Sequence, residues 1–292
     1  MTPTRSYGSS GLQLSELGLG AGQLGDARLS EVDAADLLAA SLDAGVTLID
    51  TAPSYGLSEQ RIGRHLASRR NEAVISTKLG YGVEGIPDWT GPCITAGVDQ
   101  ALRILRTDHL DIAHLHSCPW SVLAQGDVVD ALERVKQAGK VRAIAYSGEN
   151  EDLDYAVGMD RFDGFMASLN LFDQRVIDRI LPRITGKGFI AKRPSANHPW
   201  RFGSQPVGDY CETYWQRWQA MDLDNDGMEW GELAIRFALS IPGVSSAIVG
   251  TGRTAHLLQN RDWAMAGPLA PETVASWRKR FAERDQDWSG QI

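Results

Sequence analysis

Short apolar runs alternate with longer helical patterns along this 292-residue chain, and this alternation constrains the fold more than any other feature. From about residue 17 onward it continues without a long linker or a low-complexity stretch. The runs are β-branched or aliphatic rather than strictly alternating with polar residues, which is typical of parallel strands covered on both faces. The predicted strands are Leu17–Gly20, Val46–Asp50, Ala73–Lys78, Leu110–Leu115, Val141–Tyr146, Gly164–Ser168, Gly188–Ala191 and Ser245–Val249.

Helical patterns fill the intervals between these strands. The first begins at Ser30 with acidic residues that suit the positive end of the helix dipole, and Gly45 suits its C-terminal cap. Eight strands with interleaved helices predict an α/β fold, a (β/α)8 TIM barrel. A doubly wound sheet is the alternative, although the first strand lacks the dinucleotide fingerprint of that fold. The predicted helices are Ser30–Ala44, Glu59–Ser68, Thr95–Leu105, Val128–Gln137, Asp173–Ile184, Met228–Ile241 and Thr254–Ala264.

Three segments extend a bare barrel, and we interpret residues 1–292 as a single domain. Ser6–Leu14, with two glycines between short apolar positions, predicts a hairpin that closes the bottom of the barrel. Pro271–Asp287 predicts an extra C-terminal helix. Asn197–Leu223 is the longest connection after a strand, and in a barrel it lies on the catalytic face, where such excursions shape substrate access.

Composition excludes several classes of function. The chain is 43% hydrophobic and 23% charged, with a net charge of −8 and no dense Lys/Arg cluster, so we expect no nucleic-acid partner. The N-terminus does not resemble a signal peptide and no run of apolar residues is long enough to span a membrane, so we predict a cytoplasmic protein without a membrane partner. The three cysteines form no metal-type pair and suit reduced, mostly structural thiols. The oligomeric state stays open.

Ionisable residues follow three consecutive predicted strands, at the end of a barrel where active sites lie. Asp50 and Tyr55 follow the second strand, Lys78 the third and His116 the fourth. A tyrosine with its ordinary pKa of about 10 is a weak acid at neutral pH, and a neighbouring ammonium lowers that pKa. We therefore predict that Asp50 pairs with Lys78, that Lys78 lowers the pKa of Tyr55, that Tyr55 is the general acid, and that His116 hydrogen-bonds a substrate carbonyl.

Each of these residues has a structural interpretation when taken alone. A tyrosine after a strand often only anchors a loop, and a lysine at a strand end is often solvated. His114, two residues before His116, faces the same side one layer deeper, and we predict a buried structural role for it. The functional interpretation rests on four residues of compatible chemistry that share one mouth of the barrel.

Several motifs, spread over nearly the whole chain, resemble the aldo-keto reductase family. They are Tyr7-Gly8 with Ser10-Gly11-Leu12, Leu17-Gly18-Leu19-Gly20, Asp50-Thr51-Ala52 with Tyr55-Gly56, Glu59 and Ile62-Gly63, and Leu110-Asp111 with His116. The resemblance implies that Asp50, Tyr55, Lys78 and His116 are the family's catalytic tetrad. It further implies direct hydride transfer from the nicotinamide C4 to the carbonyl carbon of a small-molecule substrate.

The cofactor residues implied by the resemblance depart from the family pattern after the later strands. Ser147 matches the serine near the carboxamide, but Gly148 stands for the usual Asn and Met166 for the usual Gln. Where the family has a stacking aromatic followed by Ser-Pro-Leu, this chain has Lys192-Arg193-Pro194-Ser195. Lys192 and Arg193 are therefore candidates for lying over the nicotinamide ring or binding the pyrophosphate; the alternative is that both point to solvent.

The segment from Gly250 to Arg253, followed by Gln259-Asn260, resembles the part of the family that wraps the adenosine end. An arginine fork suits a 2′-phosphate, so Arg253 favours NADP(H) over NAD(H). The implied cofactor-binding residues are Gly20, Ala21, Gly22, Asp50, Ser147, Met166, Asn170, Lys192, Arg193, Pro194, Gly250, Thr251, Arg253, Gln259 and Asn260.

We therefore predict an NADPH-dependent aldehyde or ketone reductase. The alternative is a cofactor-binding barrel with a sensory or regulatory role and little turnover. A hydrolase or isomerase would need a metal cluster or a carboxylate pair at the strand ends, and no metal site is predicted. The segment Asp222–Gly227 imitates the start of a calcium loop, but its twelfth position is Leu233 rather than a carboxylate. Five tryptophans are candidate walls of an apolar substrate pocket, or they pack in the shell: Trp120, Trp200, Trp215, Trp218 and Trp288.

Overall fold

The computed structural model describes residues 2–291, and within them eight parallel strands close into a barrel. The strands follow one another around the ring in chain order, and the last pairs with the first to close it. The predicted (β/α)8 barrel is thereby confirmed. The strands are β3 (Leu17–Gly20), β4 (Leu48–Asp50), β5 (Val74–Leu79), β6 (Leu110–His116), β7 (Val141–Ser147), β8 (Gly164–Ser168), β9 (Gly188–Lys192) and β10 (Ser246–Gly250).

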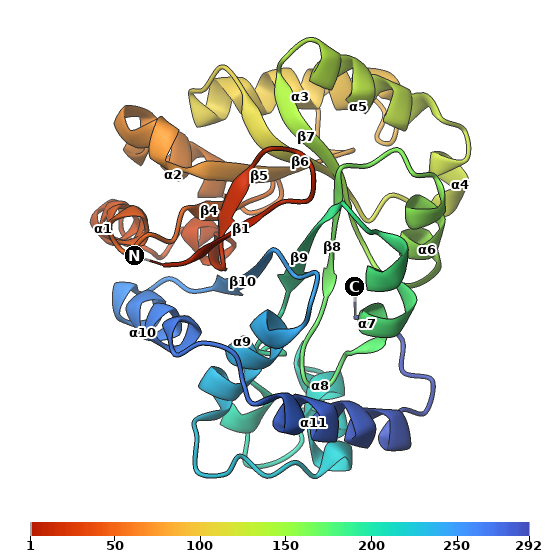
Figure 1. Cartoon of the computed structure of the whole chain (residues 1–292). Helices are drawn as coiled ribbons and strands as arrows, with labels where there is room; N and C mark the ends of the chain where they lie inside the picture. Colours follow the sequence, from red (N-terminus) through yellow and green to blue (C-terminus); the bar gives the residue numbers. More distant parts are fainter. Residues whose placement is uncertain (1, 292) are drawn as a thin grey trace.

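Helices surround the ring of strands (Figure 1). Most of them follow a strand and return the chain to the bottom of the barrel, while α8 and α11 pack together outside the ring. The helices are α1 (Glu31–Asp43), α2 (Ser58–His65), α3 (Gly91–Leu105), α4 (Trp120–Leu123), α5 (Asp127–Gln137), α6 (Asn150–Gly158), α7 (Arg175–Arg179), α8 (Glu212–Met221), α9 (Trp230–Ser240), α10 (Thr254–Met265) and α11 (Pro271–Arg284).

The boundary signals of helix α1 act as the sequence predicts. The Ser30 hydroxyl accepts a hydrogen bond from the Asp33 backbone N–H at 3.1 Å, which satisfies one of the free donors of the first turn. At the other end Gly45 has a φ of 76°, the left-handed conformation that ends many helices. The extra C-terminal helix is also confirmed, as α11.

Several helical segments differ from the prediction, among them the short helix α4, which was not predicted. The helix predicted over Asp173–Ile184 is wrong in length: α7 ends at Arg179 and a 3₁₀ turn covers Leu181–Arg183, because Pro182 cannot continue the α-helical hydrogen bonds. Helix α6 was not predicted, since only three of its positions are buried. The connection Asn197–Leu223 contains helix α8, so it is not wholly irregular.

The N-terminal hairpin closes the bottom of the barrel, as predicted. Strand β1 (Thr4–Ser6) pairs antiparallel with β2 (Gln13–Ser15), and Tyr7 between them is fully buried. The Ser9 N–H donates to the carbonyl oxygen of Gly186 at 2.9 Å, just before β9. Apolar side chains from the strands fill the interior above the hairpin; they include Leu48, Ile112, Ala145, Ile190 and Ile248. The hairpin and these apolar side chains therefore fill the lower part of the barrel interior.

All three cysteines lie within the described part of the chain, where each is buried and unpaired. None of the helices in residues 2–291 combines the length and apolar composition needed to cross a bilayer. The same residues contain no group of three or more His, Cys, Asp or Glu side chains that could hold a metal ion.

Candidate active site

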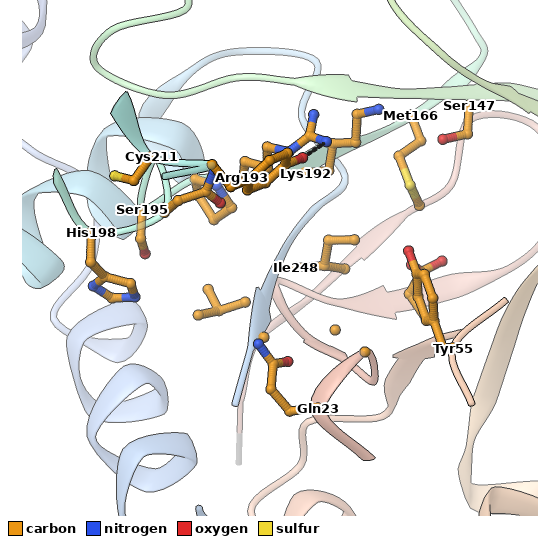
Figure 2. A pocket seen from close by; sticks show the side chains of 18 of the residues that line it. Gln23, Tyr55, Ser147, Met166, Lys192, Arg193, Ser195, His198, Cys211 and Ile248 are labelled. Atoms are coloured by element: carbon orange, nitrogen blue, oxygen red, sulfur yellow. Dashed lines mark hydrogen bonds between the residues drawn. The ribbon is translucent and has the colours of Figure 1, made fainter. Parts of the chain in front are cut away.

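A cavity of about 510 Å³ opens at the carboxyl ends of the strands. Its walls come from strands on both sides of the ring and from the connection between β9 and α8 (Figure 2). Twelve of the residues singled out by the sequence line it: Gly20, Gly22, Asp50, Tyr55, Lys78, His116, Ser147, Met166, Lys192, Arg193, Pro194 and Gly250.

A buried ion pair forms the floor of this cavity. The Lys78 ammonium donates to the Asp50 carboxylate and, at 3.0 Å, to the backbone carbonyl of Thr51. Both charged residues are only 2% exposed. Ser76 lies opposite Asp50 in the register of β4 and β5 and donates to the same carboxylate at 2.7 Å. The predicted ion pair between Asp50 and Lys78 is therefore present in the structure.

Tyr55 lies in the loop between β4 and α2, and a close approach of two backbones shapes this loop. A Cβ atom added to Gly25 would lie 1.7 Å from the Tyr55 carbonyl oxygen, so only glycine fits there. Burial raises the pKa of the Tyr55 phenol, and the negative charge of Asp50 adds to this effect. The predicted lowering of the Tyr55 pKa is therefore wrong for this structure: burial and the charge of Asp50 outweigh the effect of the Lys78 ammonium, which is itself paired with Asp50.

His116 ends strand β6 and lies beside the same cavity. Its Nδ1 atom is 2.6 Å from the Tyr81 hydroxyl. Burial lowers the His116 pKa to about 3, and the positive charges of Lys78, Lys192 and Arg193 act in the same direction. The imidazole is therefore neutral at physiological pH. His114 is fully buried beneath it, 3.0 Å from the Ser76 hydroxyl, in the structural position that the sequence predicted.

The depressed pKa of His116 predicts how stability depends on pH. An unfolded chain binds a proton at this histidine below its ordinary pKa of about 6.5, whereas the folded chain does so only near pH 3. The contribution of neutral His116 to the free energy of unfolding is therefore fully present above pH 6.5 and is lost as the pH falls toward 3. We expect His116→Gln to reduce this acid destabilisation by on the order of 1–3 kcal/mol at pH 4–5. Urea unfolding at pH 4.5 and 7.5 measures it, with exposed His256→Gln as control; identical pH dependence in wild type and His116→Gln would contradict it.

The cations that replace the expected aromatic residue are held by a buried carboxylate. Glu149 is 4% exposed, and its Oε1 lies 3.0 Å from Lys192 Nζ. The same oxygen accepts hydrogen bonds from the Ser168 N–H and hydroxyl, both at 2.8 Å. Arg193 donates to Ser168 Oγ at 3.0 Å and to the Tyr210 hydroxyl. Lys192 and Arg193 thus lie in the cavity wall and not in solvent.

Tyr55 and the more distant part of the loop after β9, from Ser195 to His198, occupy opposite ends of the cavity. Figure 2 shows Tyr55 facing Met166 and Ser147, with Ser195 and His198 at the far end. Three consecutive residues of this loop, numbers 196–198, have left-handed φ values of 46°, 59° and 57°. Ser195 Oγ and Asn197 Nδ2, which both belong to cavity-lining residues, are buried without a hydrogen-bond partner among residues 2–291. Such orphaned donors indicate a polar group that the chain itself does not supply.

The structure does not bring every predicted residue to the cavity wall. Asn170 lies behind it and donates to the Arg193 carbonyl at 3.1 Å. Arg253 is exposed at the start of α10, and its backbone N–H donates to Thr251 Oγ1 at 3.1 Å. No ion pair joins Arg253 to another described residue. The predicted residues outside the wall are Ala21, Asn170, Thr251, Arg253, Gln259 and Asn260.

The cavity also contains residues that sequence reasoning missed. Most belong to the connection after β9, whose place on the catalytic face the sequence did indicate. Tyr81 does not line the cavity but contacts His116; it follows β5 by two residues, and that position was its only signal in the sequence. None of the five candidate tryptophans lines the cavity; Trp200, for instance, stacks on Trp230 in the shell. The missed lining residues are Gln23, Ser195, Asn197, His198, Arg201, Asp209, Tyr210, Cys211, Ile248 and Val249.

Comparison with known proteins finds similarity over most of this chain. A model of the aldo/keto reductase family matches residues 16–280. L-galactose dehydrogenase of Arabidopsis thaliana is 26% identical over 88% of this chain and 86% of its own length. D-threo-aldose 1-dehydrogenase of a Pseudomonas species is 29% identical over 88% of this chain and 91% of its own. The holo structure of an aldo-keto reductase from Bacillus halodurans superposes with a TM-score of 0.82, at 25% identity over 96% of both chains.

Proposed function

We propose that this chain, which belongs to the aldo/keto reductase family, is an NADPH-dependent reductase that converts aldehydes or ketones to alcohols. Family membership and its dehydrogenase relatives make it an NAD(P)H-dependent oxidoreductase. One observation carries the finer proposal: Asp50, Tyr55, Lys78 and His116, from three successive strands and the loops after them, line one cavity.

The residues present fit a dinucleotide cofactor. Ser195 Oγ and Asn197 Nδ2 offer unpaired donors beside the left-handed turn, where a diphosphate would be held. Arg201 belongs to the same part of the wall, and its guanidinium lies 3.6 Å from the Asp209 carboxylate. Ser147, Met166 and Lys192 would surround the nicotinamide near Tyr55. When bound, the cofactor supplies the hydride for the carbonyl carbon.

The chain's own residues would then manage the charge on the carbonyl oxygen. His116 is neutral and would donate a hydrogen bond that holds and polarises this oxygen. Tyr55 would give its proton to the same oxygen as negative charge develops there. The raised pKa of Tyr55 does not prevent this step, because an alkoxide is a stronger base than a phenolate. Arg193, whose positive charge favours the ionised form of Tyr55, would stabilise the phenolate that is left.

Arg253 is the proposed source of selectivity for NADPH. It is exposed, begins α10 and makes no ion pair within residues 2–291, so its guanidinium is free for a 2′-phosphate. We expect Arg253→Ala to weaken NADPH binding about 10- to 100-fold, the equivalent of 1–3 kcal/mol, and to leave NADH binding nearly unchanged. Tryptophan fluorescence quenching measures both affinities, with exposed Arg284→Ala on α11 as control. An equal loss for both cofactors would refute this role.

Assays of purified protein with NADPH and a panel of aldehydes and ketones test the reaction itself. Oxidation of NADPH in proportion to the alcohol formed would support the proposal. Tight NADPH binding without turnover on any carbonyl would instead favour the sensory or regulatory alternative. The specific observation behind that alternative is the altered wall, in which Met166 stands at the usual glutamine position and Lys192 is tied to Glu149.

A further inference from the structure

Tyr81 is a residue outside the tetrad that contacts one of its members directly. Its hydroxyl lies 2.6 Å from His116 Nδ1 and 2.9 Å from the Ser54 hydroxyl. The Tyr81 and His116 rings lie 5.6 Å apart between centroids, at an angle of 33°. Tyr81 therefore connects the loop after β4, which carries Ser54, to the end of β6.

The position of the Tyr81 ring is set by the residues around it. Gly80 has a φ of 122°, and a Cβ atom there would lie 2.2 Å from the ring of Trp89. The backbone N–H of Trp89 donates to the Gly80 carbonyl at 2.7 Å, and the Trp89 ring centroid lies 6.2 Å from that of Tyr81. Trp89 can take this place only because residue 80 is glycine. Tyr81 is thus packed between Trp89 and His116.

The hydrogen bond to Nδ1 decides which nitrogen of His116 carries the proton. A neutral imidazole has one N–H, so one ring nitrogen donates and the other accepts. If Nδ1 carried the proton, it would donate to Tyr81, and Nε2 could not donate to a substrate carbonyl. If Tyr81 donates to Nδ1, the proton is on Nε2. The phenol is a stronger acid than the N–H of neutral imidazole, which favours the second arrangement, and Ser54 can then donate to the phenol oxygen.

We propose that Tyr81, supported by Ser54, holds His116 in the tautomer that is protonated on Nε2, so that His116 can donate to the carbonyl oxygen. Tyr81 is on this view a positioning residue, which acts through His116. The three cations around His116, Lys78, Lys192 and Arg193, oppose a second proton on the ring and keep this choice between tautomers open to Tyr81. The consequence for turnover rests on the proposed function, whereas the tautomer itself does not.

Nitrogen-15 NMR of histidine-labelled protein tests the tautomer without any substrate. We expect His116 in the wild type to show a protonated Nε2 and an unprotonated, hydrogen-bonded Nδ1; His116→Gln identifies its signals. In Tyr81→Phe, the two nitrogen shifts should move toward each other as both tautomers become populated. Tyr155→Phe, which removes an exposed hydroxyl on α6, should change neither shift. A protonated Nδ1 in the wild type, or unchanged His116 shifts in Tyr81→Phe, would overturn the proposal.

Steady-state kinetics test the consequence. Tyr81→Phe should lower kcat and kcat/KM together by about five- to tenfold, with the affinity for NADPH unchanged. The reason is that it weakens the hydrogen bond from His116 Nε2 to the carbonyl oxygen, which is not a contact with the cofactor. Ser54→Ala should have a smaller effect of the same kind, since the bond from Tyr81 to Nδ1 remains. A loss of kcat without a change of tautomer would show that Tyr81 only packs and would reject the proposal. If the wild type reduced no carbonyl, the proposed function would fail, and the NMR result would still decide the tautomer.

Discussion

Tyr55→Phe is expected to lower kcat by about 10²- to 10⁴-fold, the usual contribution of a general acid, while the affinity for NADPH stays nearly unchanged. The substitution removes only the phenol oxygen, which makes no hydrogen bond to another residue within residues 2–291. Tyr55 is held instead through its backbone N–H, which donates to the Ala52 carbonyl at 3.1 Å. Single-turnover reduction of one carbonyl substrate, followed by NADPH absorbance, measures the effect.

Tyr210→Phe is the matched control for Tyr55→Phe, because Tyr210 lines the same cavity but makes its hydroxyl bond to Arg193. This control should retain most of the turnover. Full activity of Tyr55→Phe would eliminate Tyr55 as the proton donor and would leave His116 as the candidate for that role. Loss of NADPH binding in Tyr55→Phe would instead show that the phenol serves the cofactor pocket.

Lys78→Met is expected to destabilise the fold by about 3–5 kcal/mol, because it leaves the Asp50 carboxylate buried without its counter-charge. Asp50 would keep only the Ser76 hydroxyl as a donor. Lys136→Met is the control: Lys136 also pairs with an aspartate, Asp163 at 2.6 Å, but its side chain is 38% exposed. Exposed pairs contribute about 0–1 kcal/mol, so this variant should stay close to the wild type. Urea unfolding at pH 7.5 compares the two.

A double variant separates the charge effect from the loss of packing. Asp50→Leu combined with Lys78→Met removes both charges and should recover much of the stability lost in Lys78→Met, although it should be inactive. Exposed ion pairs contribute at most about 1 kcal/mol. If the free energy of unfolding of Lys78→Met lay within that range of the wild-type value, the pair of Asp50 and Lys78 would not be buried in solution. Equal destabilisation by the single and double variants would attribute the effect to packing.

The wall after β9 shows how this chain accommodates its departure from the family pattern. Lys192 and Arg193 occupy the region where the resemblance implies an aromatic residue, and Glu149, from the start of α6, supplies the buried charge beside them. Arg193 also donates to the carbonyl of Gln291 at 2.5 Å, so the C-terminal segment touches the same residue. Lys192 and Arg193, which stand in place of the aromatic residue, thus belong to a network of polar contacts with Glu149 and the C-terminal segment. No single position in the sequence indicates this network.

The sequence by itself determined the barrel and the location of its chemistry. Continuous apolar runs are typical of parallel strands buried on both faces, and the helical patterns between them supply the crossovers. Because parallel strands end at the same edge, Asp50, Lys78 and His116 had to meet at one mouth. Ser30 and Gly45 also predicted the ends of α1, because a helix cap acts on residues that are its neighbours in the chain.

Tertiary structure decided what depends on residues distant in the sequence. Tyr81 meets His116 across 35 positions of the sequence, and Glu149 meets Lys192 across strand β8, and periodicity encodes neither contact. The direction of the Tyr55 pKa shift was set by burial and by the nearby charge of Asp50, and neither effect can be read from residue types. Packing in three dimensions fixes the solvent exposure and the charge around each group, so it alone determined the electrostatics of this site.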